Sequence, residues 1–146
     1  MDQTNEILWK KRFKEAVLPR YQTDGAAGFD LHSAEEDELK PGQWRMFDTG
    51  WSVAIPAGYE MQIRPRSGLA SKYGVTVLNS PGTIDSDYRG PIKIILINHG
   101  KSAFRVRIGQ RIAQAVVAPV SRLSFSESAT LPESERGENG FGSTGR

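Results

Sequence analysis

The chain has 146 residues, 38% of them hydrophobic, which is enough for one domain with its own core. Its 19 basic and 17 acidic residues leave a net charge of only +2, which excludes the basic surface of a dedicated duplex-binding protein. The lack of cysteine excludes disulfides, thiolate metal sites and thiol nucleophiles, and two histidines are too few for a histidine-rich metal site.

The predicted elements, in chain order, are mainly short strands between turn residues. Residues 7–17 permit a helix, but a strand over about residues 7–13 agrees better with the rest of the chain. Residues 67–73 predict one short helix, with Ser67 as its N-cap and Gly74 at its end. Alternating apolar residues predict further strands around Trp44 and Met46 and at 51–55, 59–63, 75–78, 92–97, 104–108 and 112–120. This spacing favours an all-β sandwich or jelly roll.

The last segment, residues 126–146, differs from the preceding β domain, residues 1–125. It is rich in serine, glutamate and glycine and has too few apolar residues to build a core. We therefore expect a flexible C-terminal arm. The arm is either a frayed tail or a loop that closes over an anion, because Arg136 and Phe141 accompany its glycines.

No segment has the roughly 18–20 consecutive apolar residues that a membrane span needs. The N-terminus has no apolar run for a signal peptide, and its basic residues 10–12 lie among polar ones. We expect a soluble, cytoplasmic protein with neither a membrane nor a nucleic-acid partner.

Two segments have residue types suited to phosphate chemistry. Pro65-Arg66-Ser67-Gly68 precedes the predicted helix, where an arginine and unpaired amides would bind an anion, although ordinary helix capping is the alternative. Residues 82–90 predict a polar hairpin between two apolar strands. In it, Asp85 could deprotonate a water that faces a polarised electrophile, although a plain turn is the alternative.

Other polar residues have simpler interpretations. Asp30 is a single acid in an apolar strand. An acid in such a position is more often a structural residue with satisfied hydrogen bonds than a ligand. We interpret residues 109–114 as a solvated turn and residues 35–38 as a solvated acidic loop. His32 and His99 have no partner at a diagnostic spacing, so we interpret both as non-catalytic.

Five segments that are weak signals individually become specific when they occur together in one order. They are Ala27-Gly28-Phe29-Asp30-Leu31, Pro65-Arg66-Ser67-Gly68-Leu69-Ala70, Gly82-Thr83-Ile84-Asp85-Ser86-Asp87-Tyr88-Arg89-Gly90, Gly109-Gln110-Arg111-Ile112-Ala113-Gln114 and Arg136-Gly137 to Gly145. This set resembles the motifs of the trimeric dUTPase family, the deoxyuridine triphosphate nucleotidohydrolases. Two departures are Gln110, where many members have an acid, and Asn139, where a glycine is common.

The resemblance implies a jelly-roll-like distorted β-barrel with one short helix, and a flexible arm that closes over an active site. It implies a homotrimer with shared active sites that converts dUTP and water to dUMP and pyrophosphate, with Mg²⁺ on the triphosphate. Such a reaction supplies dUMP for thymidylate synthesis and keeps uracil out of DNA.

The resemblance also implies roles for individual residues. Asp85 would activate the water that attacks the α-phosphorus, and Asp30 would contact Mg²⁺ indirectly, through water or by supporting the site. Contacts to the phosphates would come from Arg66, Ser67, Gly68, Gln114, Arg136, Gly142, Ser143 and Thr144. Contacts to the base and sugar would come from Asn79, Thr83, Ile84, Asp85, Tyr88, Lys93 and Phe141.

Three other functions remain open from the sequence. A dCTP deaminase, or a bifunctional deaminase and dUTPase, shares the β fold, although the complete arm and Asp85 favour the hydrolase. A non-catalytic protein could keep the fold and bind the nucleotide as a signal. A nucleic-acid-binding β-barrel is the third alternative, and the small net charge argues against it.

Overall fold

The computed structural model describes residues 5–145. Residues 1–4 and 146, the outer ends of the expected β domain and arm, lie outside the described residues. The described part contains β1 (Leu8–Lys11), β2 (Phe29–His32), β3 (Asp37–Leu39), β4 (Trp44–Ala54), β5 (Tyr59–Arg64), α1 (Ser67–Tyr73), β6 (Val75–Val77), β7 (Gly82–Ile84), β8 (Pro91–Asn98), β9 (Phe104–Val106) and β10 (Arg111–Pro119). The expectation of a mostly β fold with one short helix is confirmed.

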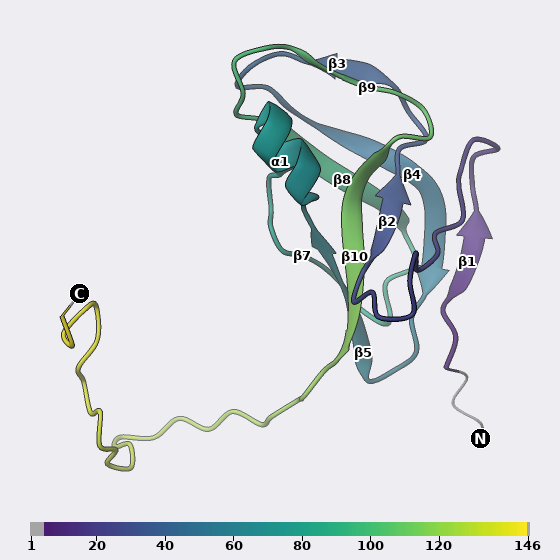
Figure 1. The fold of residues 1–146 in the computed structure, drawn as a ribbon. Coiled ribbons are helices and arrows are strands. Elements are labelled where there is room, and N and C mark those ends of the chain that lie inside the picture. The colour runs from purple at the N-terminus through teal and green to yellow at the C-terminus, as the bar shows by residue number, and fades with distance from the viewer. Residues whose placement is uncertain (1–4, 146) are drawn as a thin grey trace.

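The strands form two four-stranded sheets and one small sheet, and every strand pair is antiparallel. The orders are β1-β4-β8-β6, β2-β10-β5-β7 and β3-β9. In Figure 1, β2 and β10 lie in front of β4 and β8, and α1 lies at one end of the body. Inward-facing side chains of both large sheets form the core, which includes Phe47, Met61, Ile94 and Leu96, all fully buried.

The alternating pattern of β8 shows why these residues form a strand. Ile92, Ile94 and Leu96 are buried, whereas Lys93 between them is exposed. Each buried side chain of this size contributes roughly 1.5–3 kcal/mol of transfer free energy relative to its exposed state. A strand presents these three residues to one face, which a helix would not do.

Two of the predicted strand extents differ clearly from the structure. The two strands expected around Trp44 and at 51–55 are one long strand, β4, with a register shift between Asp48 and Ser52. The strand expected at 104–108 ends at Val106, because a turn closed by the Gln110 N–H and the Arg107 carbonyl follows it.

Ser67 as the N-cap of the helix was wrong. Arg66 occupies the N-cap position, and no side chain caps the first turn. The predicted end at Gly74 is correct, since its φ of 68° is left-handed and its N–H bonds the carbonyls of Ala70 and Leu69. The first-turn amides of α1 are therefore left without a side-chain partner.

The interpretation of residues 35–38 as a solvated loop was wrong in part: Glu36, Asp37 and Glu38 are exposed, but the segment is not a plain loop. Asp37 begins β3, which pairs with β9, and Glu36 forms an ion pair with Arg105 at 3.7 Å. Glu35 forms another with Arg45 at 3.4 Å. Neither arginine lies within the acidic run, and Arg105 is far from it in sequence, so the run alone did not reveal these partners.

The hairpin predicted for residues 82–90 was also wrong. β7 pairs with β5, whereas β8 pairs with β4 and β6, so the segment crosses from one large sheet to the other. Period-two patterning identifies a strand but not its partner. The crossing places residues 85–90 where the two sheets diverge.

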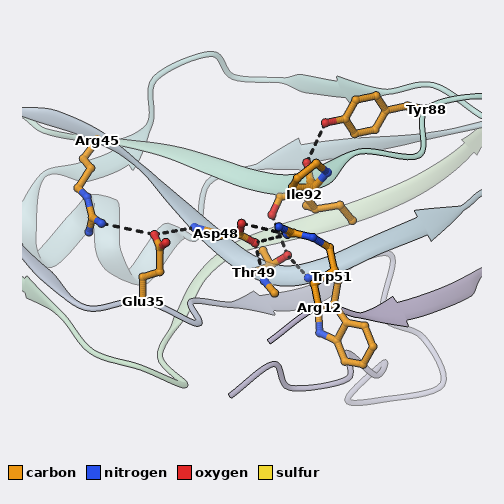
Figure 2. A network of polar contacts seen from close by, with 10 residues as sticks. Arg12, Glu35, Arg45, Asp48, Thr49, Trp51, Tyr88 and Ile92 are labelled. Atoms are coloured by element: carbon orange, nitrogen blue, oxygen red, sulfur yellow. Dashed lines mark hydrogen bonds and ion pairs between the residues drawn. The ribbon is translucent and has the colours of Figure 1, made fainter. Parts of the chain in front are cut away.

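A buried carboxylate fastens the N-terminal segment to β4 (Figure 2). Both oxygens of Asp48 accept from Arg12 Nη1 at 3.0 Å, and Oδ1 also accepts the Gly50 N–H at 2.7 Å. Glu35 Oε2 accepts the N–H of Asp48 at 3.1 Å. Gly50, with φ of 80°, lies so close to the segment that an added Cβ would be 2.7 Å from the Ala16 Cβ. These contacts hold the chain in place at the register shift of β4, between Asp48 and Ser52.

Arg12→Ala is expected to lower the free energy of unfolding by about 3 kcal/mol, because removing one partner of a buried pair leaves an uncompensated charge. The Asp48 side chain is only 5% exposed. Urea unfolding measures the loss. Lys14→Ala, which changes an exposed cation nearby, is the control. A loss below about 1 kcal/mol for Arg12→Ala would show that solvent replaces the arginine.

The chain beyond β10 leaves the body. The Val120 N–H still bonds the Gly58 carbonyl at 2.8 Å, but the residues after it run away from the sheets as an extended trace (Figure 1). Leu123 is 81% exposed, Phe125 98% and Leu131 85%. This segment adds nothing to the core of its own chain.

Across residues 5–145, none of the helices has the length and apolar character needed to cross a bilayer. The cytoplasmic location expected from the sequence stays a prediction.

Candidate active site

A pocket of about 360 Å³ lies between β7 and β8. Its floor is apolar and includes Ile63, Val77 and Ile94 from the adjoining strands. The lining also contains six residues singled out in the sequence: Asn79, Thr83, Ile84, Asp85, Tyr88 and Lys93. An apolar cleft with a few convergent polar groups is the usual form of a small-molecule site.

The turn after β7 brings a carboxylate and an aromatic ring together at the pocket. The Tyr88 N–H donates to the Asp85 carbonyl at 3.1 Å, and the Tyr88 hydroxyl donates to the Pro91 carbonyl at 2.9 Å. Asp85 is exposed, and its carboxylate has no hydrogen bond or ion pair among the described residues. It is therefore available to accept a proton from a ligand or a water.

A second polar cluster surrounds Asp30 on β2. Its Oδ1 accepts from Arg66 Nε at 3.1 Å, and Arg111 Nη1 lies 3.5 Å from its Oδ2. Arg66 Nη1 also donates to the Arg111 carbonyl at 3.5 Å. We call Asp30, Arg66 and Arg111 the arginine cluster. One carboxylate orients two guanidinium groups whose other N–H donors remain free for an anion.

Gln114 connects the arginine cluster to the turn before α1. It lies opposite Asp30 in the β2–β10 ladder, and its Nε2 donates to the Pro65 carbonyl at 3.0 Å. This bond holds Pro65 in place, and Arg66, Ser67 and Gly68 follow it directly in the chain. This places the uncapped first turn of α1 beside the cluster.

His32 lies on the same face of β2 as Asp30 and opposite Arg111 on β10. Its Nδ1 is buried with no hydrogen-bond partner in the described structure. Burial lowers the pKa of His32 below its ordinary value; Arg111 and Arg66 act in the same direction, and Asp30 opposes them. The imidazole is neutral in the folded protein near neutral pH.

This environment predicts a pH effect on stability. Since folding lowers the pKa of His32 below the ordinary 6.5, the unfolded chain binds the proton first as the pH falls. The contribution of neutral His32 to the free energy of unfolding is complete above about pH 6.5, and it is lost as the pH falls through the lowered pKa. His32→Gln is expected to lose less unfolding free energy than the wild type between about pH 7.5 and 5.5. Equal losses of unfolding free energy for the variant and the wild type, measured by urea unfolding, would show that His32 is not the source of the pH dependence.

The arm residues of the site lie apart from both clusters. Arg136 Nε donates to the Asn139 carbonyl at 2.7 Å, and the Ser143 N–H donates to the Gly140 carbonyl at 3.0 Å. Phe141 is fully exposed, with φ of 51°. The arm thus carries a pre-formed glycine-rich turn that touches neither the pocket nor the arginine cluster. Gly142 and Thr144 belong to the same turn.

The described chain therefore holds the expected site residues as three separate groups: the pocket, the arginine cluster and the arm. The pocket has no lining residue in common with the arginine cluster. A second pocket of about 390 Å³, lined by Trp9, Tyr21 and Phe29 among others, has no residue in common with either. Residues 5–145 contain no group of three or more acidic or histidine side chains that could hold a metal.

Two residues of this region were missed. Arg111 was assigned to a solvated turn, and it is indeed half exposed, but it pairs with Asp30 across two strands. His32 had no sequence partner, and only the β2–β10 register brings it to the cluster. The sequence contains one indication of this arrangement. Asp30 and His32 are two residues apart in a strand, so their side chains lie on the same face.

Solved structures define the class to which this fold belongs. A dUTPase of Staphylococcus bacteriophage 80alpha, solved with dUPNHPP, matches with a TM-score of 0.92 at 29% sequence identity. The match covers 98% of this chain and 100% of that one. The G164S mutant of the same phage enzyme, with dUpNHpp, matches with a TM-score of 0.91 at 29% identity, over 98% of this chain and 100% of that one. The fold is that of the dUTPases.

Sequence comparison gives the family itself. The dUTPase family model matches residues 14–145. Deoxyuridine 5'-triphosphate nucleotidohydrolase of Nautilia profundicola is 58% identical over 94% of this chain and 96% of its own. Those of Helicobacter hepaticus and Wolinella succinogenes are each 54% identical, over 95% and 97% of this chain and 88% and 95% of theirs. The chain belongs to the dUTPase family.

Proposed function

We propose that this chain hydrolyses dUTP to dUMP and pyrophosphate. Relatives more than half identical over nearly their whole length are named for this reaction. The observation that carries the proposal is the pocket in which Asn79, Asp85 and Tyr88 come together. The product would supply thymidylate synthesis, and the reaction would keep uracil out of DNA.

The pocket suits a deoxynucleoside. The Asn79 amide has both donors and an acceptor, as recognition of the uracil edge requires. The backbone around Thr83 and Ile84, with Lys93 on the opposite strand, completes the base and sugar contacts. The Tyr88 ring lies beneath the deoxyribose, where a ribose 2′-hydroxyl would clash.

The arginine cluster suits the phosphates. Asp30 accepts from the Nε–H of Arg66, and the Arg111 carbonyl accepts from its Nη1, which fixes the guanidinium plane. The remaining N–H groups of Arg66 are left for phosphate oxygens. Ser67 and Gly68 add the uncapped amides of the first turn of α1. Gln114 already donates one amide hydrogen to Pro65, and its second remains for a phosphate.

Asp85 acts on the water. Its carboxylate accepts a proton as the water oxygen bonds to the α-phosphorus, and the bond from that phosphorus to the bridging oxygen of the β-phosphate breaks. Pyrophosphate departs with the electron pair of that bond. A free, exposed carboxylate at the pocket is suited to this step because no protein group competes for its lone pairs.

The residues present fit Mg²⁺ that arrives on the triphosphate. Both oxygens of Asp30 face arginines, so the carboxylate would reach a metal through water, and no described cluster forms a cage. When bound, Mg²⁺ would neutralise charge that develops on the phosphates. Asp30 would help to hold the hydrated ion through its water ligands.

The division of the site favours a homotrimer with shared active sites. One chain keeps its pocket, arginine cluster and arm apart, and the arm exposes two large apolar side chains, Leu131 and Phe141. In the assembly, the arm of residues 126–146 would cross to another subunit. There Arg136 would meet the γ-phosphate and Phe141 would stack on the uracil, while Gly142, Ser143 and Thr144 would meet the phosphates.

The substrate assignment is tested by incubating the protein and Mg²⁺ with dUTP, dCTP, dTTP and UTP separately and separating the products. We expect dUMP and pyrophosphate from dUTP, with the other three nucleotides largely intact. Ammonia from dCTP would indicate the deaminase instead, and intact dUTP would refute the proposal.

The assembly is tested by light scattering of the purified protein. We expect a mass near three times that of one chain, at all concentrations used for activity. A single-chain mass in a fully active sample would refute shared sites.

A further inference from the structure

The Tyr88 ring lies directly against the backbone of Gly90. A Cβ atom placed on Gly90 would lie 2.5 Å from Tyr88 Oη, 2.6 Å from Cζ and 3.0 Å from Cε2. Non-bonded carbon atoms normally stay about 3.5–4.0 Å apart. Any side chain at position 90 therefore overlaps the ring in its present position.

Space, rather than backbone freedom, is what requires glycine here. Gly90 is not among the glycines with positive φ, so another residue could adopt its backbone conformation. The neighbouring contact is the hydrogen bond from the Tyr88 hydroxyl to the Pro91 carbonyl, at 2.9 Å. The Tyr88 ring therefore lies over Gly90, and its hydroxyl is hydrogen-bonded to the next residue, Pro91.

Core packing does not hold this ring. Tyr88 is 43% exposed, whereas aromatic rings fixed by the core are nearly covered. Its position depends on the Asp85 turn at one end and on the Gly90–Pro91 backbone at the other. A change at Gly90 can therefore move the ring without disturbing the sheets.

We propose that Gly90 determines sugar specificity, because its missing side chain sets the Tyr88 ring at the position that excludes a 2′-hydroxyl. This inference rests on the proposed function, in which the ring lies beneath the deoxyribose. Gly90 is a positioning residue, since it acts through Tyr88 rather than on the substrate.

Gly90→Ala is expected to raise the ratio of kcat/KM for UTP to that for dUTP about tenfold, the scale of discrimination by one group in a pocket. The KM for dUTP rises more than its kcat falls, because Asp85 stays in place. Gly25→Ala is the matched control, since Gly25 has open space around it and no positive φ. Thermal unfolding of both variants checks that the fold is intact.

A second background separates the ring from other effects. With Tyr88→Ala alone, discrimination against UTP falls, and adding Gly90→Ala should then change the UTP to dUTP ratio by less than about twofold. A ratio in Gly90→Ala equal to that of the wild type overturns the inference. The same loss of discrimination with and without the Tyr88 ring also overturns it.

The two proposals fail differently. If the wild type hydrolyses dUTP and rejects UTP while Gly90→Ala rejects UTP equally well, only this inference fails. If the wild type hydrolyses neither nucleotide, the proposed function fails and this inference fails with it.

Discussion

Asp85→Asn is expected to lower kcat for dUTP by roughly 10²–10⁴, the usual contribution of a positioned general base. Asparagine keeps the size and the exposed position of the side chain but cannot accept a proton from water. KM should stay within about twofold, because asparagine keeps the size of the side chain at this position of the pocket lining. Steady-state kinetics with dUTP and Mg²⁺ measures both constants.

Asp87→Asn is the matched control. Asp87 lies two residues further along the same turn, is also exposed and does not line the pocket. It removes the same charge and should leave kcat within about twofold of the wild type. An equal fall in kcat for the two variants would mean that the net charge of the turn, and not a base at position 85, supports turnover.

Ending the chain at Glu135 is expected to lower kcat/KM by about 10³ without changing the thermal unfolding temperature. Residues that close over a phosphate and supply an arginine account for effects of this size. The arm is exposed along its length and buries no part of its own domain, so its loss removes no core packing. Kinetics and thermal unfolding of the shortened chain test the two parts separately.

Two point variants divide the effect of the arm. Arg136→Gln should weaken the arm's contact with the phosphates, and Phe141→Ala its contact with the base. Each variant should lower kcat/KM by less than the whole deletion does. Full activity of the shortened chain would reduce the arm to a frayed tail. A lower unfolding temperature would show that the arm supports the body instead.

The sequence predicted the strands well where burial alternates, and less well where partners had to be chosen. The β8 pattern and the stop at Gly74 follow from local chemistry, namely side-chain periodicity and left-handed glycine. The crossing from β7 to β8 does not, because the same pattern suits a hairpin. The acidic run at 35–38 shows the same limit, since its pairing with Arg45 and Arg105 depends on which strands lie side by side.

The candidate site shows the same limit. The family resemblance named candidate residues, and six of these candidates line the pocket. Their roles in the site stay a prediction. The motifs did not predict that Asp30 binds Arg66 and Arg111 together, because that contact depends on strand register and on α1. Nor did they reveal the space that Gly90 leaves for Tyr88, which exists only after the turn has folded.

In the proposed reaction, a water activated by Asp85 attacks the α-phosphorus of dUTP. The position of attack is measured by hydrolysis in water enriched in heavy oxygen, with mass spectrometry of both products. We expect the label in dUMP, because the new bond forms at the α-phosphorus. Label in pyrophosphate would place the attack on the β-phosphorus and would refute this mechanism.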